Sequence, residues 1–395
     1  MMFYDWGVPP PLIDPTECLA GSLKPVTEVS MRRSHITRLL LLFLIAAFAV
    51  GWRSPAASLP TGIYNPINMT LADHTLYVSD QASGVHIYNV AAPASPQFIS
   101  RIALNGHRGT AVKDDIVYAS TYNSLRVYRR EGDTFTYLTA LESEYDYDWG
   151  NDVVDEGTSF ACACRTGSFA DTEPTSPPGS SSYATFAVID DYLYRVDGSK
   201  LITYDIGDPA KPKEIGKVSL GWTIETLYPT SEYLFVGGTR GMYVCSRSNP
   251  AKPALIGEVQ HFRACDPVVV SGQTAFVTLR GGNGCGDTRD ALLTIDISDP
   301  TKPAVVGEKS LATPFGLAVS EPYLYVSTGA NGYALFSVAD PKAPAAVGSW
   351  AGWPTRDFLW ASNVLYVLGE DDVRIFDVTD PTEPVLLATI ENDPS

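Results

Sequence analysis

Short apolar segments with an aromatic residue near their centre recur along this chain at a nearly constant interval. Typical copies read TLYVSD (75–80), YLFVGG (233–238) and YLYVST (323–328). Their length and their aromatic and β-branched content predict strands. The seven aromatic residues, spaced by 41, 76, 41, 41, 49 and 41 residues, are Tyr77, Tyr118, Tyr194, Phe235, Phe276, Tyr325 and Tyr366. A period of roughly 40 residues built from strands alone is typical of propeller blades.

A second motif accompanies the first. After each aromatic strand comes another apolar strand, followed in six of the seven units by a turn related to D-P-x-x-P, as in DISDPTKPAVVG (296–307). Proline fixes φ and the preceding Asp or Asn bonds local backbone, so the motif predicts a stiff hairpin turn. The second unit has YRREGDTFTYLTALE (128–142) instead. The first prolines of the six copies are Pro93, Pro209, Pro250, Pro300, Pro341 and Pro381.

The best-preserved repeat divides into four strands. They are FGLAVSEP (315–322), YLYVSTG (323–329), YALFSV (333–338) and AAVGSWAG (345–352). No amphipathic helical stretch competes with strands inside the repeats. We therefore predict an all-β fold, a seven-bladed β-propeller of four-stranded antiparallel blades that spans 60–392 as a single domain.

The third strand and its turn also resemble a known repeat. LLTIDISDPTKPAVVG (292–307) and VRIFDVTDPTEPVLL (373–387) are similar to the LVIVD repeat of bacterial surface propellers, and five or six of the seven units share the likeness. The resemblance implies a secreted or envelope-exposed propeller. It brings no catalytic motif that could be transferred to residues of this chain.

The segment before the repeats has the layout of an export signal. Basic RRSHITR (32–38) precedes the apolar run LLLLFLIAAFAV (39–50), and small residues follow, with expected cleavage after Ala56 or Ala57. We expect 31–57 to be a signal peptide, with an uncleaved N-terminal membrane anchor as the alternative. Segment 1–30 is either a disordered tail or a mis-assigned start, in which case Met31 is the first residue. The expected location is extracellular, at the cell surface or periplasmic.

The net charge of the chain limits the classes of partner that it can bind. The chain carries a net charge of −17, and 58–395 holds 41 acidic against 23 basic residues. Nucleic-acid binding needs clustered Lys and Arg, so we exclude it. Contact with a membrane is expected only through the N-terminal segment if that remains uncleaved. The expected partners are a protein, a peptide or a glycan.

Five cysteines lie in 58–395. Cys245 occupies a repeat position that holds Tyr, Ile or Phe in other units, which predicts a buried free thiol. Cys265 and Cys285 belong to one blade and should reach the same rim, and an oxidising compartment would allow a disulfide between them. Cys162 and Cys164 could pair with each other, with another chain or, less readily, with a metal.

The longest departure from the repeat is 143–182. Its first half is acidic and aromatic, and its second half is rich in Ser, Pro and Gly. Asp146, Asp148, Asp152 and Asp155 could hold Ca²⁺, a cation that prefers several oxygen ligands. The spacing lacks a D-x-D-x-D-G pattern, which favours a solvated acidic loop. No cofactor is predicted, and Ca²⁺ is the one metal that remains open.

Alignment of the repeats selects a candidate site. The position ten residues before each aromatic should lie where the first strand of a blade enters the central channel. It holds Ile67, Arg108, Ala184, Glu225, Asp266, Phe315 and Arg356. We predict a ligand site at this channel mouth, formed by Arg108, Glu225, Asp266 and Arg356 with His107, His261 and Trp353 nearby. Mutual salt bridges are the alternative role for these charges.

Catalytic motifs are missing from the sequence. It contains no G-x-S-x-G elbow, no H-E-x-x-H pair and no paired-histidine spacing. The leading hypothesis is a non-catalytic interaction module that uses the channel mouth and the 143–182 insert. The alternative is an extracellular hydrolase or lyase that uses mouth carboxylates with or without a divalent metal. Carboxylates and histidines that converge in one pocket without neutralising arginines would favour the enzyme.

Overall fold

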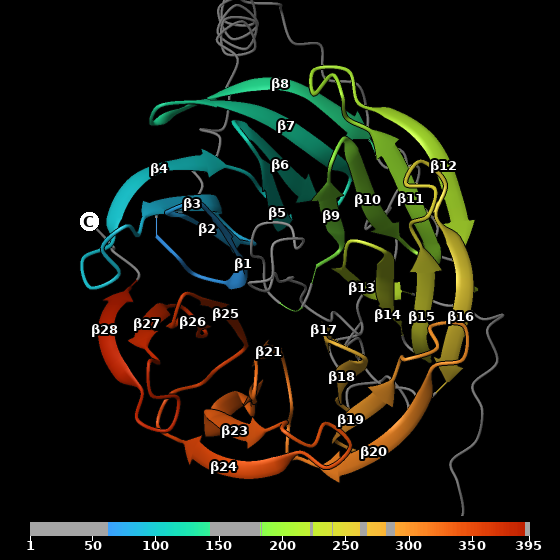
Figure 1. Cartoon of the computed structure of the whole chain (residues 1–395). Coiled ribbons are helices and arrows are strands. Elements are labelled where there is room, and N and C mark those ends of the chain that lie inside the picture. Colours follow the sequence, from blue (N-terminus) through green and yellow to red (C-terminus); the bar gives the residue numbers. More distant parts are fainter. Residues whose placement is uncertain are drawn as a thin grey trace, which may run out of the picture. The chain divides into compact units, whose positions relative to one another are not determined.

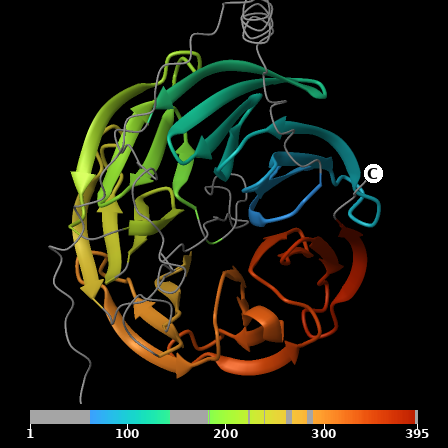
Figure 2. The same ribbon diagram turned by 180° about the vertical axis from the view of Figure 1, so that it is seen from behind.

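The computed structural model describes residues 62–142, 182, 184–221, 224–238, 240–260, 267–281 and 289–391. The chain divides into two compact units, Met1–Ser58 and Leu59–Ser395. All described residues belong to the second unit. They form seven four-stranded antiparallel sheets arranged in a ring (Figures 1 and 2).

Each sheet is one blade and uses four consecutive strands. Blade 1 comprises β1 (Pro66–Ala72), β2 (Thr75–Asp80), β3 (Gly84–Asn89) and β4 (Gln97–Ala103). Blade 2 comprises β5 (His107–Lys113), β6 (Ile116–Thr121), β7 (Ser124–Glu131) and β8 (Thr134–Glu142). Blade 3 comprises β9 (Phe186–Ile189), β10 (Tyr192–Asp197), β11 (Lys200–Asp205) and β12 (Lys213–Ser219). Blade 4 comprises β13 (Ile224–Pro229), β14 (Tyr233–Gly238), β15 (Gly241–Ser246) and β16 (Ala254–Gln260).

The remaining blades follow the same plan. Blade 5 comprises β17 (Val268–Ser271), β18 (Thr274–Leu279), β19 (Ala291–Asp296) and β20 (Ala304–Ser310). Blade 6 comprises β21 (Leu317–Ser320), β22 (Tyr323–Ser327), the short 3₁₀ helix η1 (Gly329–Asn331), β23 (Tyr333–Ser337) and β24 (Ala345–Trp350). Blade 7 comprises β25 (Asp357–Ala361), β26 (Val364–Leu368), β27 (Val373–Asp377) and β28 (Val385–Ile390). The predicted all-β fold of seven four-stranded antiparallel blades is confirmed, while the strands of blade 6 are shorter at their ends than the predicted segments.

The first strand of each blade lies nearest the channel and the fourth lies on the outside (Figure 1). The second strands carry the repeat aromatics, and all seven rings are at most 3% exposed. They pack between blades, which explains why the period is so regular: every blade must present one large apolar group to its neighbour. The fourth strands are half-exposed.

The D-P-x-x-P motif forms the turn between the third and fourth strands. Asp299 Oδ1 accepts a hydrogen bond from the Thr301 amide at 3.0 Å, and Asp380 Oδ1 accepts one from the Thr382 amide at 2.9 Å. The predicted turn chemistry is confirmed. In blade 2 a short turn through Gly132, at φ 65°, replaces it.

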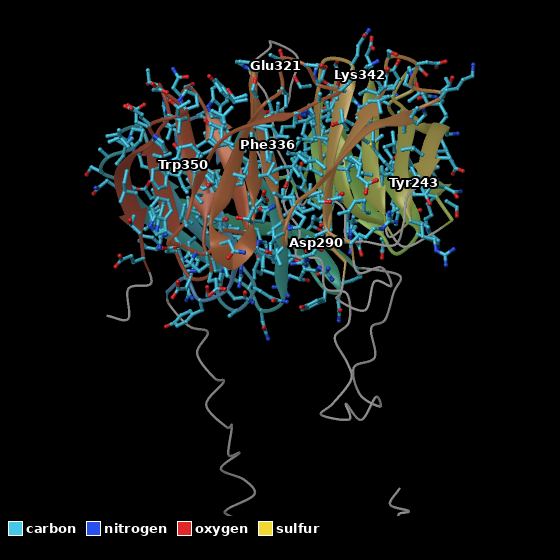
Figure 3. All side chains as sticks on the ribbon, turned by 90° about the horizontal axis from the view of Figure 1, so that it is seen from below. Tyr243, Asp290, Glu321, Phe336, Lys342 and Trp350 are labelled. Carbon is cyan, nitrogen blue, oxygen red and sulfur yellow. The ribbon has the colours of Figure 1, made fainter. Side chains whose placement is uncertain are left out.

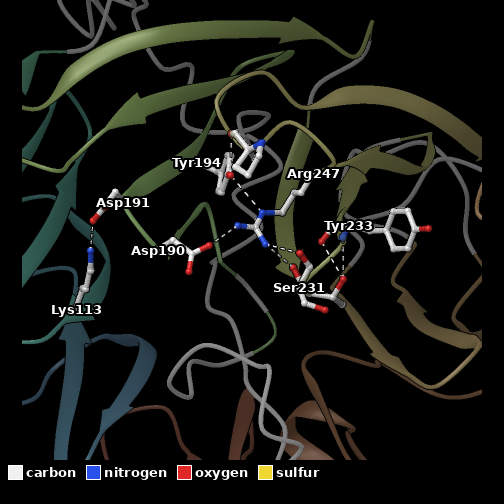
Figure 4. Close-up of polar contacts among 9 residues, drawn as sticks. Lys113, Asp190, Asp191, Tyr194, Ser231, Tyr233 and Arg247 are labelled. Atoms are coloured by element: carbon white, nitrogen blue, oxygen red, sulfur yellow. Dashed lines mark hydrogen bonds and ion pairs between the residues drawn. The ribbon is translucent and has the colours of Figure 1, made fainter.

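A buried arginine links blades 3 and 4. Arg247 donates hydrogen bonds to the Tyr194 hydroxyl at 3.2 Å and to the Ser231 carbonyl at 2.7 Å. It also pairs with Asp190 at 3.3 Å, while its side chain is 3% exposed (Figure 4). Because the guanidinium spreads its bonds over several acceptors, its charge is tolerated in the interior.

The two ends of the strands define two faces. Seen from the side, Glu321 and Lys342 lie at one face of the ring and Asp290 lies toward the other (Figure 3). Glu321 lies in the turn between the first two strands of blade 6, and Lys342 lies in the turn between its third and fourth strands. Asp290 precedes the third strand of blade 5. The segments between second and third strands, including the one with Asp290, lie at the same face. We call this face the upper face, although it points downwards in Figure 3.

Several sequence predictions lie outside the described residues. They are the signal or anchor segment, the acidic residues Asp146, Asp148, Asp152 and Asp155, and the cysteines Cys162, Cys164, Cys265 and Cys285. No helix in the described part of the chain is long and apolar enough to cross a membrane. Cys245 is a buried free thiol as predicted, and burial raises its pKa to about 12, so it is unreactive in the folded protein.

Candidate functional site

A pocket opens at the channel on the upper face. Its volume is about 230 Å³, and it lies where blades 5, 6 and 7 meet blade 1. Three residues of the aligned channel position line it, namely Ile67, Phe315 and Arg356. Of the residues that the sequence predicted for a ligand site, Arg356 lines this pocket. Its other lining residues are Arg280, Gly329, Ala330, Pro354, Thr355, Asp357 and Glu370.

The aligned position has a structural reason for facing the channel. In blades 1, 2 and 4 the pairing of the first two strands shifts at this residue, leaving Ile67, Arg108 and Glu225 as the extra residue of a β-bulge. A bulged residue is released from the alternation of the strand, and its side chain can be redirected. In these three blades the bulged position can therefore place a different side chain at the channel.

Arg280 is the most distinctive group in the pocket. Its guanidinium carbon lies 3.9 Å from the centre of the Phe315 ring, which is cation–π geometry. Its Nε is buried and has no hydrogen-bond acceptor. Among the described residues Arg280 forms no ion pair. A buried donor without an acceptor costs free energy, so Arg280 is incompletely hydrogen-bonded within the described part of the chain while its side chain lines the pocket.

The stack of Arg280 on Phe315 is held by backbone contacts. Asp290 Oδ1 accepts from the Gly281 amide at 2.9 Å, and Asp290 Oδ2 accepts from the Thr313 amide at 2.8 Å. One carboxylate thus ties together the segments that carry the arginine and the ring. Thr278 also donates to the Phe315 carbonyl at 2.6 Å. The pair is fixed in place before any ligand arrives.

Arg356 lies beside this pair and reaches toward blade 1. Its Nη1 donates to Asn65 Oδ1 at 3.1 Å and to the Pro66 carbonyl at 3.2 Å. Half-buried, it joins the last blade to the first while one side of the residue lines the pocket. It therefore has a structural contact as well as a place at the predicted site.

Asp357 is held inside the structure through one of its two carboxylate oxygens. Its Oδ1 accepts from the Ser182 hydroxyl at 2.8 Å and from the Phe358 amide at 2.9 Å. Ser182 also accepts from the Leu317 amide at 3.0 Å. Although Ser182 precedes blade 3 in sequence, it is buried against blades 6 and 7. The end of the 143–182 insert thus lies in the channel, which the repeat pattern alone did not indicate.

The other predicted charges are dispersed. Arg108 lies over the Tyr122 ring, 5.1 Å from its centre. Glu225 is 8% exposed in β13. Neither of them lines the pocket that contains Arg356. Asp266 and His261 lie outside the described residues.

Of two predicted neighbours of the mouth, His107 is buried in the interior and Trp353 is partly buried against the core. His107 is completely buried, its Nε2 lies 3.1 Å from the Thr110 hydroxyl, and burial lowers its pKa to about 3. Trp353 stacks on Phe376 with ring centres 5.1 Å apart, under the Arg374 guanidinium. The repeat pattern placed both residues near the start of the first strand of a blade, but it did not show how far other side chains cover them.

A Ser, His and Asp cluster in blade 1 is also structural. The Ser83 hydroxyl lies 2.6 Å from His86 Nε2 and 2.8 Å from Asp80 Oδ1. Asp80 also accepts from the amides of Tyr64 and Ser83. All three residues of the cluster are at most 1% exposed, so a substrate has no access to the serine. Burial lowers the pKa of His86 to about 4.

The sequence reasoning missed three lining residues that share one alignment column. The position four residues after each repeat aromatic holds Gln81, Tyr122, Gly198, Thr239, Arg280, Gly329 and Glu370. Arg280, Gly329 and Glu370 all line the pocket, and the Gln81 side chain donates to the Tyr122 hydroxyl. Reading this column together with the channel column would have found the pocket.

Comparison with solved structures agrees with the fold. A 6-phosphogluconolactonase-like protein from Bacteroides fragilis aligns with a TM-score of 0.57 at 12% identity, over 84% of this chain and 96% of the other. A periplasmic gluconolactonase from Pseudomonas aeruginosa aligns with a TM-score of 0.57 at 12% identity, over 83% and 96%. At such low identity these similarities show the fold alone. No curated protein sequence matches the chain.

Comparison with family models is more specific. The LVIVD repeat model matches residues 174–219, 263–309 and 315–351. These matches cover blades 3, 5 and 6. They include 292–307, one of the two segments that suggested the resemblance, whereas the other, 373–387, lies outside them. The chain therefore contains LVIVD repeats, and its described part folds as a seven-bladed β-propeller.

Proposed function

We propose that this propeller is a non-catalytic interaction module that binds a protein, peptide or glycan partner through the pocket on its upper face. The observation that carries the proposal is the Arg280–Phe315 pair, which presents an unused buried donor in a preformed pocket. A rigid scaffold with a small polar cavity suits recognition, because little ordering free energy is lost on binding. The sequence-based export signal suggests that the partner is met outside the cytoplasm.

The surroundings of the pocket favour binding over hydrolysis or lyase chemistry. Asp357 and Glu370 share the cavity with two arginines, and no described histidine lines it. His86 and His107 are buried elsewhere and stay neutral, since burial lowers the pKa of both. A general base needs an accessible group whose pKa is near the working pH. The arrangement therefore supports the interaction module rather than the alternative enzyme.

Matched substitutions at the two ends of β23 test this proposal. Ala330 and Ala339 are both exposed in blade 6, but β23 separates them, so they lie at opposite ends of one strand. Ala330 lines the upper pocket and Ala339 does not. Purified full-length protein would be applied to arrays of peptides and glycans as wild type, as Ala330→Trp and as Ala339→Trp.

The expected result is binding to a defined subset of the array that Ala330→Trp abolishes and Ala339→Trp leaves intact. A tryptophan at 330 fills the cavity without removing a native contact. Circular dichroism would verify that both variants are folded. Equal binding by the two variants, or chemical conversion of a bound probe, would contradict the proposal.

A further inference from the structure

The pocket at Arg280 has the chemistry of a receptor for one carboxylate group. We infer that it binds the carboxylate of a small ligand, with the guanidinium of Arg280 as the main contact and Arg356 at the side. This inference rests on the proposed function and names the chemical class of its ligand. The carboxylate can belong to the C-terminus of a peptide or to an acidic sugar.

The first argument is the state of Arg280. Its guanidinium is always charged, and within the described residues no carboxylate of the chain neutralises it. The chain as a whole has a net charge of −17, so available acidic groups are plentiful. Arg280 is partly buried and lies over the Phe315 ring, yet its Nε has no acceptor. A purely structural arginine would be expected to have its buried donors paired.

The second argument is geometry. Arginine presents its donors as a planar fork that matches the two oxygens of a carboxylate. The Phe315 ring covers one face of that plane, so an incoming group must approach along the edge where the donors point. Asp290 fixes the segments on both sides of the stack, and the donors are preorganised.

The third argument concerns the rest of the pocket. Asp357 is fully buried, and its Oδ1 accepts bonds from the Ser182 hydroxyl and the Phe358 amide, which hold it at the wall of the pocket. Glu370 is exposed and belongs to the segment before β27, where it can meet a polar or cationic part of the ligand. The volume of about 230 Å³ is at the small end for ligand sites, which suits one sugar ring or the last residues of a peptide.

Four small probes test whether the pocket recognises a carboxylate and whether that carboxylate belongs to a peptide or to a sugar. N-acetyl-dialanine as the free acid would be compared with its amide, and glucuronate with glucose. Binding to the full-length protein would be followed by isothermal titration calorimetry up to roughly 10 mM, the range in which single-group contacts are measurable. We expect at least one acid to bind about tenfold or more tightly than its neutral partner, as a charged hydrogen bond implies. The acid that binds identifies the source as peptide or glycan.

Substitution of Arg280 provides the second arm. Arg280→Met should lower the affinity of the acid about tenfold or more, and Arg280→Lys should lower it less, because the charge stays but the fork is lost. Arg129→Met, an exposed arginine of blade 2, is the matched control. Thermal unfolding would show that each variant is folded. If Arg280→Met does not fold, the comparison of acid and neutral probes on the wild-type protein still tests whether the pocket binds a carboxylate.

The inference is overturned if neither acid binds, if acid and neutral probes bind alike, or if Arg280→Met binds the acid as wild type does. These results differ from a failure of the proposed function. An array ligand that is blocked by Ala330→Trp but carries no carboxylate would leave the interaction module in place and remove only the carboxylate assignment.

Discussion

Arg356 and Asn65 are 291 residues apart in the sequence and are joined by a hydrogen bond of 3.1 Å. The contact connects blade 7 to the residue that precedes blade 1, and the Pro66 carbonyl adds a second bond at 3.2 Å. Each blade consists of one continuous stretch of chain, without a strand exchanged between the first and last blades. Side-chain contacts such as this one therefore close the ring.

Arg356→Met should lower the free energy of unfolding by about 1–2 kcal/mol, because two hydrogen bonds from a charged donor are lost at the closure. Urea unfolding followed by tryptophan fluorescence measures the change. Arg129→Met removes only an exposed pair with Asp115 and should change stability by less than about 0.5 kcal/mol. Equal effects of the two substitutions would show that the closure contact has no special weight.

Substitution of Arg247 should cause a larger loss of stability. Arg247→Met removes the donor from the buried Tyr194 hydroxyl and from the part-buried carbonyl contacts at Thr230 and Ser231, so the free energy of unfolding should fall by about 3 kcal/mol. Lys113, whose ion pair with Asp191 is exposed, is a control between blades 2 and 3 (Figure 4). Lys113→Met should cost about 0–1 kcal/mol, and a larger loss there than at Arg247 would refute the burial argument.

Gly316 and Gly109 occupy the same repeat position but should respond differently to alanine. A Cβ at Gly316 would meet the Asp357 carboxylate and lie 2.8 Å from the Arg356 carbonyl, whereas one at Gly109 would have ordinary contacts at 3.5 Å or more. Gly316→Ala should cost about 1–3 kcal/mol by overpacking, and Gly109→Ala should be nearly neutral. Thermal unfolding of both variants measures this, and a shared small effect would contradict it.

The buried histidines predict a pH dependence of stability. Burial lowers the pKa of His86 from its ordinary 6.5 to about 4, so the unfolded chain takes up a proton before the folded chain does. The free energy of unfolding should therefore fall as the pH decreases from about 6.5 to about 4, by on the order of 3 kcal/mol from this residue. Urea unfolding at several pH values measures the slope.

Substitution of the same histidine provides the control. His86→Gln should flatten the slope in this pH range, whereas His74→Gln, at an exposed position, should leave it unchanged. An identical slope in wild type and His86→Gln would assign the pH dependence to other groups.

The sequence by itself determined the architecture, because each blade must repeat the same buried aromatic and the same turn. A fixed spacing of Tyr77, Tyr118 and their equivalents is sufficient to predict seven blades, and the slot of Cys245 is sufficient to place its thiol in the core. The channel position was also readable, since Phe315 and Arg356 occur in register with the aromatics.

Only the tertiary structure decided which channel residues act together. Arg280 and Phe315 are 35 positions apart and belong to different blades, so their stacking depends on how two blades dock. Tertiary packing also buries His107 completely and brings Ser182, which precedes blade 3 in the sequence, to Asp357 in blade 7. Repeat periodicity fixes where a residue lies within its own blade. Contacts between blades depend on the shape of both surfaces, and a one-dimensional pattern does not contain that information.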